Sequence, residues 1–214
     1  MGKLFKIFIF FVLMGVGSLH AEMKVNEIRD FLNTTGSRIL ELIGSDDEDE
    51  KFEALDEIFE KDVNVSYMAR FCLGRYYRML SKNQKETYHD LFKRYVKSIY
   101  KSYPLKFNPK DIHFEILDIK EGQKSAHAEV LITLPPEMQT ETLKTVRVSF
   151  QIENKPAGGL WVNDLQIAEA SMLMSLKNRF MTMMKDDEEE IEWFLDDLET
   201  LVTSNEKQIG VISD

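Results

Sequence analysis

The stretch from Ser81 to Tyr103, SKNQKETYHDLFKRYVKSIYKSY, has a strongly amphipathic helical pattern. Its apolar side chains recur at the three- and four-residue spacing that lines one face of an α-helix: Tyr88, Leu91, Phe92, Tyr95, Val96, Ile99 and Tyr100. Ser81 followed by Gln84 predicts a capping box in the first turn. The stretch therefore predicts a helix that begins directly after Ser81 and buries one apolar face.

Further helices are predicted on both sides of this stretch. Before it, apolar residues at helical spacing predict helices over residues 23–43, 52–59 and 64–80. Pro104 and Pro109 then end helical structure, because proline lacks a backbone N–H and clashes with the preceding turn. Two more amphipathic segments, 172–184 and 191–202, close the chain. The order is α, then β, then α.

Between residues 112 and 167 the apolar period changes to two. Alternating runs at 112–116, 126–134, 146–152 and 161–167 are separated by turn signals at Gly122, Pro135-Pro136 and residues 156–159. Four strands joined by short turns predict an antiparallel meander with one apolar face. The expected fold class is α+β: a four-stranded antiparallel sheet wrapped by about six helices, with a hydrophobic pocket between sheet and helices.

The first 21 residues have the pattern of a secretory signal peptide. Lys3 and Lys6 precede an apolar run of about eleven residues, and small or polar residues follow up to Ala21. That run is well short of the roughly 20 residues that span a bilayer as a helix. We therefore expect residues 1–21 to be a leader, residues 22–214 to form a single domain, and the mature protein to be periplasmic.

The charge is unevenly spread along an acidic chain. The formal net charge is −10, yet residues 66–106 hold ten Lys and Arg against two acids, a local charge of +8. The net negative charge of the chain argues against a protein that binds nucleic acid along its surface. The basic segment could steer an anionic headgroup or an acidic partner, or it could simply solvate the outer face of two helices.

Side chains that could carry catalysis or hold a metal are sparse. Cys72 is the single cysteine, so no intrachain disulfide is possible, and its place on an apolar helix face predicts burial. His113 and His127 fit no metal-ligand spacing and fall at polar positions of strands. Asp164 is expected to form a structural hydrogen bond. No nucleophile, phosphate-loop or dinucleotide motif is present, and we expect no catalytic residue, no metal and no enzyme.

Two motifs make the chain similar to a known family. The first is Leu73-Gly74-Arg75-Tyr76-Tyr77 with Gln84 and Tyr88 downstream; the second joins the strand 146–150 to Trp161, Asp164-Leu165 and Glu169-Ala170-Ser171. On these residues the chain resembles the MlaC-type periplasmic phospholipid carriers, also called toluene-tolerance auxiliary proteins. It departs from the family pattern at Ala170, where glycine is usual, and in lacking a glycine near Asp186 or Asp187.

The resemblance implies a lipid shuttle without a cofactor. Such proteins carry a glycerophospholipid between the outer and inner membranes and hand it to an inner-membrane MCE-domain protein of an ABC transporter. An outer-membrane lipoprotein complex is the other implied partner. The lipid tails enter a pocket between sheet and helices, and the headgroup stays near the surface.

The resemblance and the apolar pattern together select the site residues. Those expected to touch the lipid are Val130, Ile132, Val146, Val148, Phe150, Trp161, Leu165, Leu173 and Phe180. Those expected to contact the headgroup or a partner are Arg75, Arg78, Lys93 and Lys97. Two alternatives stay open: a cone-shaped α+β enzyme of isomerase or dehydratase type, using His113, His127 or Asp164, and a structural interaction protein with a filled core.

Overall fold

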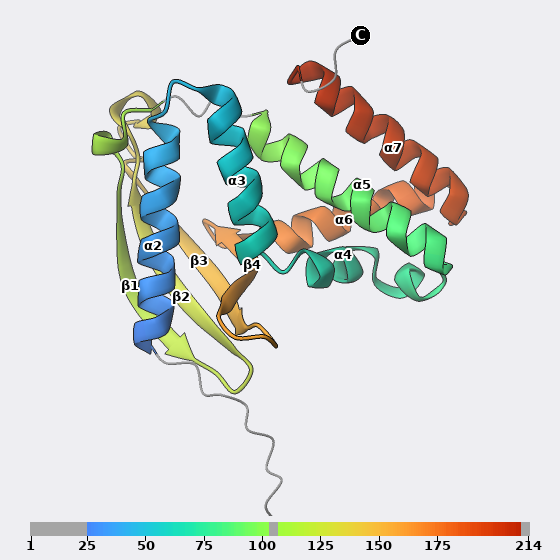
Figure 1. The fold of residues 1–214 in the computed structure, drawn as a ribbon, viewed down its shortest axis with the longest axis horizontal. Helices are drawn as coiled ribbons and strands as arrows, with labels where there is room; N and C mark the ends of the chain where they lie inside the picture. The colour runs from blue at the N-terminus through green and yellow to red at the C-terminus, as the bar shows by residue number, and fades with distance from the viewer. Residues whose placement is uncertain (1–24, 103–106, 211–214) are drawn as a thin grey trace, which may run out of the picture.

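The α+β class is confirmed by the structure, a computed structural model that describes residues 25–102 and 107–210. The predicted leader lies outside these residues. They form α2 (Val25–Ile43), α3 (Glu48–Asp62), α4 (Val65–Leu73), η1 (Gly74–Arg78), α5 (Lys82–Lys101), η2 (Pro109–Asp111), β1 (His113–Glu121), β2 (Ser125–Thr133), η3 (Pro136–Met138), β3 (Thr145–Asn154), β4 (Leu160–Ile167), β5 (Ala170–Ser171), α6 (Met172–Asp186) and α7 (Ile191–Gln208) (Figure 1). Within the described ranges, no helix combines the length and apolarity needed to cross a bilayer.

The sheet is an antiparallel meander in the order β1-β2-β3-β4-β5. The four predicted strands are present, but the predicted strand number is wrong by one. The fifth strand is only two residues long and pairs Ala170 and Ser171 with the end of β4. Two residues are too few to show an alternating pattern, so the sequence carried no signal for this strand.

The helix predicted over residues 64–80 ends earlier than expected. Gly74, at φ 56°, terminates α4 after Leu73, and the 3-10 helix η1 follows. A left-handed glycine commonly terminates an α-helix. The capping box of α5 is confirmed, since the Ser81 hydroxyl accepts from the Gln84 amide and the Gln84 side chain accepts from the Ser81 amide.

The apolar residues form two separate clusters instead of one core. One cluster joins α2 to the sheet, and it includes Ile28, Leu32 and Ile152. The other joins α3, α4, η1, α5, α6 and α7, with Phe59 of α3 and Phe180 of α6 among its buried members. In Figure 1 the two halves lie side by side, with α3 between α2 and α5. The seam between the clusters is therefore the place where an internal site can form.

Two tight turns hold non-glycine residues in the left-handed region. Ala168 and Glu169 have φ of 48° and 70° between β4 and β5, and Glu188 and Glu189 have φ of 53° and 64° between α6 and α7. This conformation costs an L-residue about 1–2 kcal/mol. Both turns lie close to Ala170 and to Asp186 and Asp187, the positions at which the sequence analysis noted departures from the resemblance. Backbone hydrogen bonds close both turns, including the bond from Glu189 N to Met184 O at 2.7 Å. The chain therefore still makes both turns without a glycine.

Candidate functional site

One face of the sheet is apolar because the antiparallel register aligns apolar residues across neighbouring strands. Residues directly opposite each other point to the same face. The aligned pairs on this face are Ala126–Ile152, Ala128–Phe150, Val130–Val148, Ile132–Val146 and Phe150–Leu165. We call it the apolar sheet face.

Helix α2 seals one end of the apolar sheet face. Ile28 and Leu32, from the N-terminal half of α2, pack with Ala126, Ala128 and Ile152. Four of these five side chains are 0% exposed, and Leu32 is 7% exposed. This end is a closed core.

The opposite end of the apolar sheet face is not sealed. Ile167 is 41% exposed. Further apolar side chains of the sheet and of the C-terminal half of α2 are only half-buried: Ile132, Val146, Phe150, Leu165, Ile39, Leu40, Leu42 and Ile43. Ile132 and Phe150 mark the border with the sealed end, because they also pack against its cluster. A filled core would bring such side chains close to zero exposure. This open end, flanked by α2 and α3, is the candidate site.

Helix α3 is held beside the candidate site by charge pairs on three sides. It contains eight acids and two lysines. Cations from α2, α5 and the turn between β3 and β4 reach its carboxylates, with N–O distances of 2.8 Å for Arg38–Glu57, 2.7 Å for Lys97–Glu60, 3.1 Å for Lys97–Asp56 and Lys101–Asp56, and 3.7 Å for Lys155–Asp62. The sequence analysis missed this arrangement, because the charges of a surface helix do not reveal their partners.

Asp56 is the centre of these charge pairs. Its carboxylate accepts hydrogen bonds from the Tyr100 hydroxyl and from the amino groups of Lys97 and Lys101. Burial raises the pKa of Asp56, but these three hydrogen bonds outweigh burial and place the pKa below its usual 3.8. A carboxyl whose pKa is lowered by folding stabilises the fold above its unfolded pKa, and this contribution is lost as the pH falls below that value.

Replacing Asp56 by asparagine is expected to lower the free energy of unfolding at pH 7 by about 1.5–3 kcal/mol, the range for hydrogen bonds to a charged group. The difference from the unmodified protein should shrink as the pH falls below the usual Asp56 pKa of 3.8. Urea unfolding at pH 7 and pH 3 measures both values. Asp49→Asn, in the exposed first turn of α3, is the control. An equal loss at both pH values would contradict the assigned role.

Most of the predicted lipid contacts lie on the apolar sheet face. Val130 and Val148 are buried there, at 3% and 5% exposure. Val148 belongs to neither apolar cluster, and the same is true of Ile58 of α3, although both are buried. The half-buried members at the open end are Ile132, Val146, Phe150 and Leu165. The structure thus brings six of the nine predicted residues together on one surface.

The other three predicted lipid contacts lie elsewhere. Trp161 is opposite Glu153, which places it on the other face of the sheet from Val162 and Ile152. Leu173 and Phe180 are packed in the helical cluster at 3% and 0% exposure. Helical periodicity predicted that the side chains of Leu173 and Phe180 point inward, but it could not predict which elements they pack against.

The predicted basic contacts divide into two pairs. Arg75 bonds to Glu189 at 2.9 Å, and Lys97 bonds to Asp56 and Glu60. Arg78 and Lys93 form no ion pair with any described carboxylate. Within the described ranges, the second pair therefore has no carboxylate to give up before it meets a ligand or partner, whereas Arg75, although exposed, would have to exchange its ion pair.

The candidate catalytic groups have structural surroundings. One carboxylate oxygen of Asp164 accepts from the amides of Leu165 and Leu173, and the other accepts from the Ser171 hydroxyl at 2.7 Å. This confirms the expected structural hydrogen bond. His113 and His127 are exposed, as expected. The described residues include no group of three or more His, Cys, Asp or Glu that could hold a metal ion.

Cys72 is buried as predicted, at 0% exposure. Burial raises the pKa of its thiol to about 12. The thiolate is the nucleophilic form of cysteine, so this thiol is unreactive at neutral pH.

Two hollows lined mostly by polar residues open on the helical half. The larger, about 580 Å³, lies along α5, and a second of about 440 Å³ lies between the C-terminal ends of α5 and α7. Neither is lined by any of the nine predicted lipid contacts. The apolar sheet face and these polar hollows are different surfaces.

Comparison with known proteins identifies similar sequences and folds. The family model described as MlaC protein matches residues 34–200. A solved phospholipid-binding protein from Ralstonia solanacearum, in complex with a phospholipid, has a similar fold, with a TM-score of 0.66 and 13% sequence identity over 81% of this chain and 96% of that chain. No curated protein matches the chain.

Proposed function

Because the chain belongs to the MlaC family, a family of non-enzymatic lipid carriers, we propose that it is a periplasmic glycerophospholipid carrier. It shuttles lipid between the outer and inner membranes and delivers it to an MCE-domain protein of an ABC transporter. An outer-membrane lipoprotein complex is the partner at the other end. The observation that supports this function best is the unsealed end of the apolar sheet face.

The energetics of lipid transfer require such a surface. Each buried methylene is worth about 0.8 kcal/mol, so two acyl chains of roughly 30 methylenes represent on the order of 20 kcal/mol. A lipid in water lacks this stabilisation, and a carrier must supply a comparably dry apolar environment. Ile132, Val146, Phe150 and Leu165 are apolar, incompletely buried and adjacent in the sheet register. In the proposal, the lipid tails complete their burial.

The position of α3 suits the loading of a carrier. It flanks the open end of the apolar sheet face, and cations on α2 and α5 hold it through the carboxylates of Glu57, Asp56 and Glu60. Exposed ion pairs are each worth about 0–1 kcal/mol. Phe59 anchors α3 to the helical cluster, so any movement of α3 during loading would be a small adjustment about this anchor.

Extraction of the purified protein tests the function. Without detergent at any step, organic solvent should release about one glycerophospholipid per chain, identified by mass spectrometry and quantified as phosphate per protein. Protein that is folded by circular dichroism but releases no phospholipid, even after incubation with phospholipid vesicles, would contradict the carrier function. It would favour the structural interaction protein instead.

A further inference from the structure

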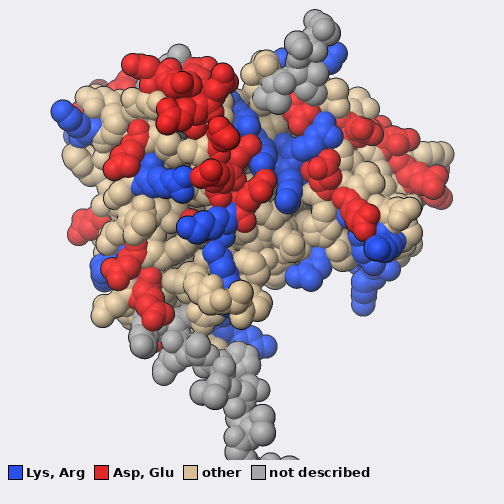
Figure 2. All heavy atoms as spheres, viewed as in Figure 1, with Lys and Arg blue, Asp and Glu red and all other residues tan. Residues whose placement is uncertain are grey.

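Five cations from three consecutive elements gather on the helical half of the molecule. We call this the basic surface: Arg70 of α4, Arg78 of η1, and Lys82, Lys85 and Lys93 of α5. Figure 2 shows blue atoms toward the lower right, over the junction of η1 and α5, whereas red atoms gather over the start of α3. The larger hollow belongs to this surface, with walls of Ser66, Lys82, Lys85, Glu86, His89, Asp90 and Lys93.

The cations of the basic surface lack the intramolecular partners found elsewhere. Arg94 and Lys97, also on α5, bond to carboxylates at 2.6 and 2.7 Å. By contrast, Arg70, Arg78, Lys85 and Lys93 form no ion pair with a described carboxylate. Other exposed lysines, such as Lys110 and Lys144, also form no ion pair with a described carboxylate, so the distinguishing feature of the basic surface is that its cations are clustered. A cluster of cations is complementary to an external anion.

The acids within the surface do not cancel its charge. Glu86 lies 4.0 Å from Lys82 and offsets that one cation, whereas Asp90 lies 3.7 Å from Arg94, outside the basic surface, so four of the five cations remain uncompensated. Glu60 forms an ion pair with Lys97, and the charges of Lys97 and, more weakly, Lys93 lower the pKa of its carboxyl group. Charges farther away than about 8 Å are largely screened at physiological ionic strength. The negative charge on the rest of the molecule therefore weakens this local field only slightly.

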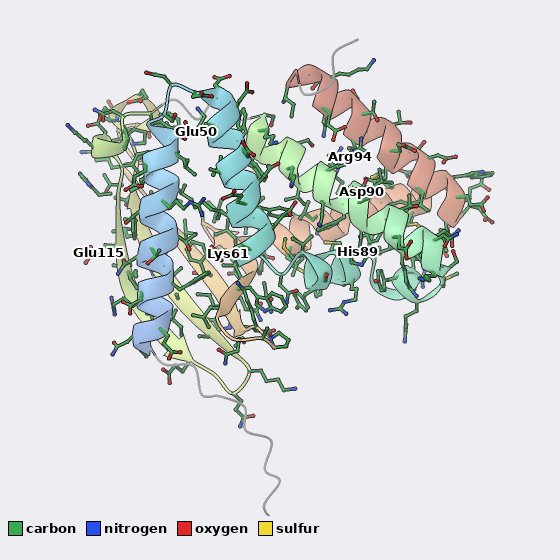
Figure 3. The ribbon with its side chains drawn as sticks, viewed as in Figure 1. Glu50, Lys61, His89, Asp90, Arg94 and Glu115 are labelled. Atoms are coloured by element: carbon green, nitrogen blue, oxygen red, sulfur yellow. The ribbon has the colours of Figure 1, made fainter. Side chains whose placement is uncertain are left out.

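His89 adds no positive charge near neutral pH. Figure 3 shows it on the side of α5 that faces α4 and η1, where its Nε2 lies 2.8 Å from the Tyr77 hydroxyl. Burial, together with the charges of Arg70 and Lys93, lowers the pKa of His89 below its usual 6.5. The surface is basic because of its lysines and arginines.

The basic surface also contains apolar side chains. Met79, between Arg78 and Lys82 in the chain, is 62% exposed, and the amino group of Lys85 lies 5.5 Å from the centre of the Tyr77 ring. Cations interleaved with an exposed apolar side chain suit the boundary of an anionic bilayer, where phosphates meet acyl chains. An acidic protein could also match the cations, but it would have to place an apolar pocket at Met79, whereas a bilayer presents acyl chains beneath its phosphates at every point.

We propose that the basic surface docks the protein onto an anionic phospholipid bilayer, with Met79 entering the interface. The inference rests on the proposed carrier function for its purpose, because a carrier must reach a bilayer or a membrane complex to exchange its cargo. The docking surface lies on the helical half, away from the apolar sheet face. Docking and cargo binding can therefore be tested separately.

Co-sedimentation with vesicles tests the docking surface. We expect the protein to sediment with vesicles of 30% phosphatidylglycerol in phosphatidylcholine, and not with pure phosphatidylcholine vesicles. Each Lys or Arg near an anionic surface changes partitioning about fivefold. The triple variant Arg70→Glu, Lys85→Glu, Lys93→Glu should therefore bind the anionic vesicles at least about 100-fold more weakly, and raised salt should weaken binding of the unmodified protein.

A charge-matched control is available on the other half of the molecule. Lys110→Glu, Lys124→Glu and Lys144→Glu change the net charge equally at exposed positions, and this variant should retain most of the vesicle binding. Equal loss in both triple variants, or no binding of the unmodified protein to anionic vesicles, would overturn the proposal. Retention of the unmodified protein on immobilised polyglutamate without vesicle binding would assign the surface to an acidic protein instead. Extractable lipid, measured in the same samples, reports separately on the carrier function.

Discussion

Replacing Phe180 by alanine is expected to lower the free energy of unfolding by about 3–5 kcal/mol, the usual cost of truncating a buried phenylalanine. Its ring is 0% exposed. The ring centroids of Tyr88, Phe92, Tyr95 and Phe194 lie 5.5–6.2 Å from that of Phe180. Truncation would leave a cavity at the point where α5, α6 and α7 meet. Guanidinium unfolding followed by far-ultraviolet circular dichroism measures the loss.

A second variant on the same helix isolates the packing effect. Met174 is 45% exposed, so Met174→Ala should change the free energy of unfolding by about 0.5 kcal/mol or less. If Phe180→Ala costs under about 1 kcal/mol, the helical half is not packed around this ring. Phe180 would then again be a candidate lipid contact, as the sequence analysis expected.

Periodicity was sufficient to predict the main elements. The spacing from Tyr88 to Tyr100 predicted α5, and the Ser81–Gln84 pair predicted its first turn. The change to a period of two between residues 112 and 167 predicted four strands and their turns. These features are local, since each depends on residues within one helical turn or one hairpin.

The features that sequence reasoning missed depend on distant residues. Phe180 and Val148 both have inward-facing apolar patterns, but only the packing of α6 against α5 and α7 separates a core residue from a residue of the sheet face. The end of α4 at Gly74 was missed because the apolar pattern continues past it. The partners of Asp56 lie 41 to 45 residues away, beyond the reach of any spacing rule.

Filling the open end of the apolar sheet face should remove the cargo while keeping the fold. Val146 is half-buried, lies opposite Ile132 in the register and belongs to neither apolar cluster. A tryptophan at this position would occupy space assigned to the lipid tails. Displacing only two buried methylenes costs about 1.6 kcal/mol, more than tenfold in affinity. Val146→Trp is therefore expected to weaken phospholipid binding at least about tenfold, so that it retains less phospholipid per chain than the unmodified protein when the two compete for a limiting supply of vesicles.

The neighbouring residue provides the matched control for this variant. Arg147 lies on the same strand but on the opposite face, where it is opposite Leu131 and pairs with Glu129 on the surface. Arg147→Trp adds an indole to the same strand without entering the apolar sheet face, so its phospholipid content should stay close to that of the unmodified protein. Circular dichroism of both variants verifies the fold. Undiminished phospholipid in folded Val146→Trp would show that the tails bind elsewhere, because an indole and an acyl chain cannot occupy the same volume.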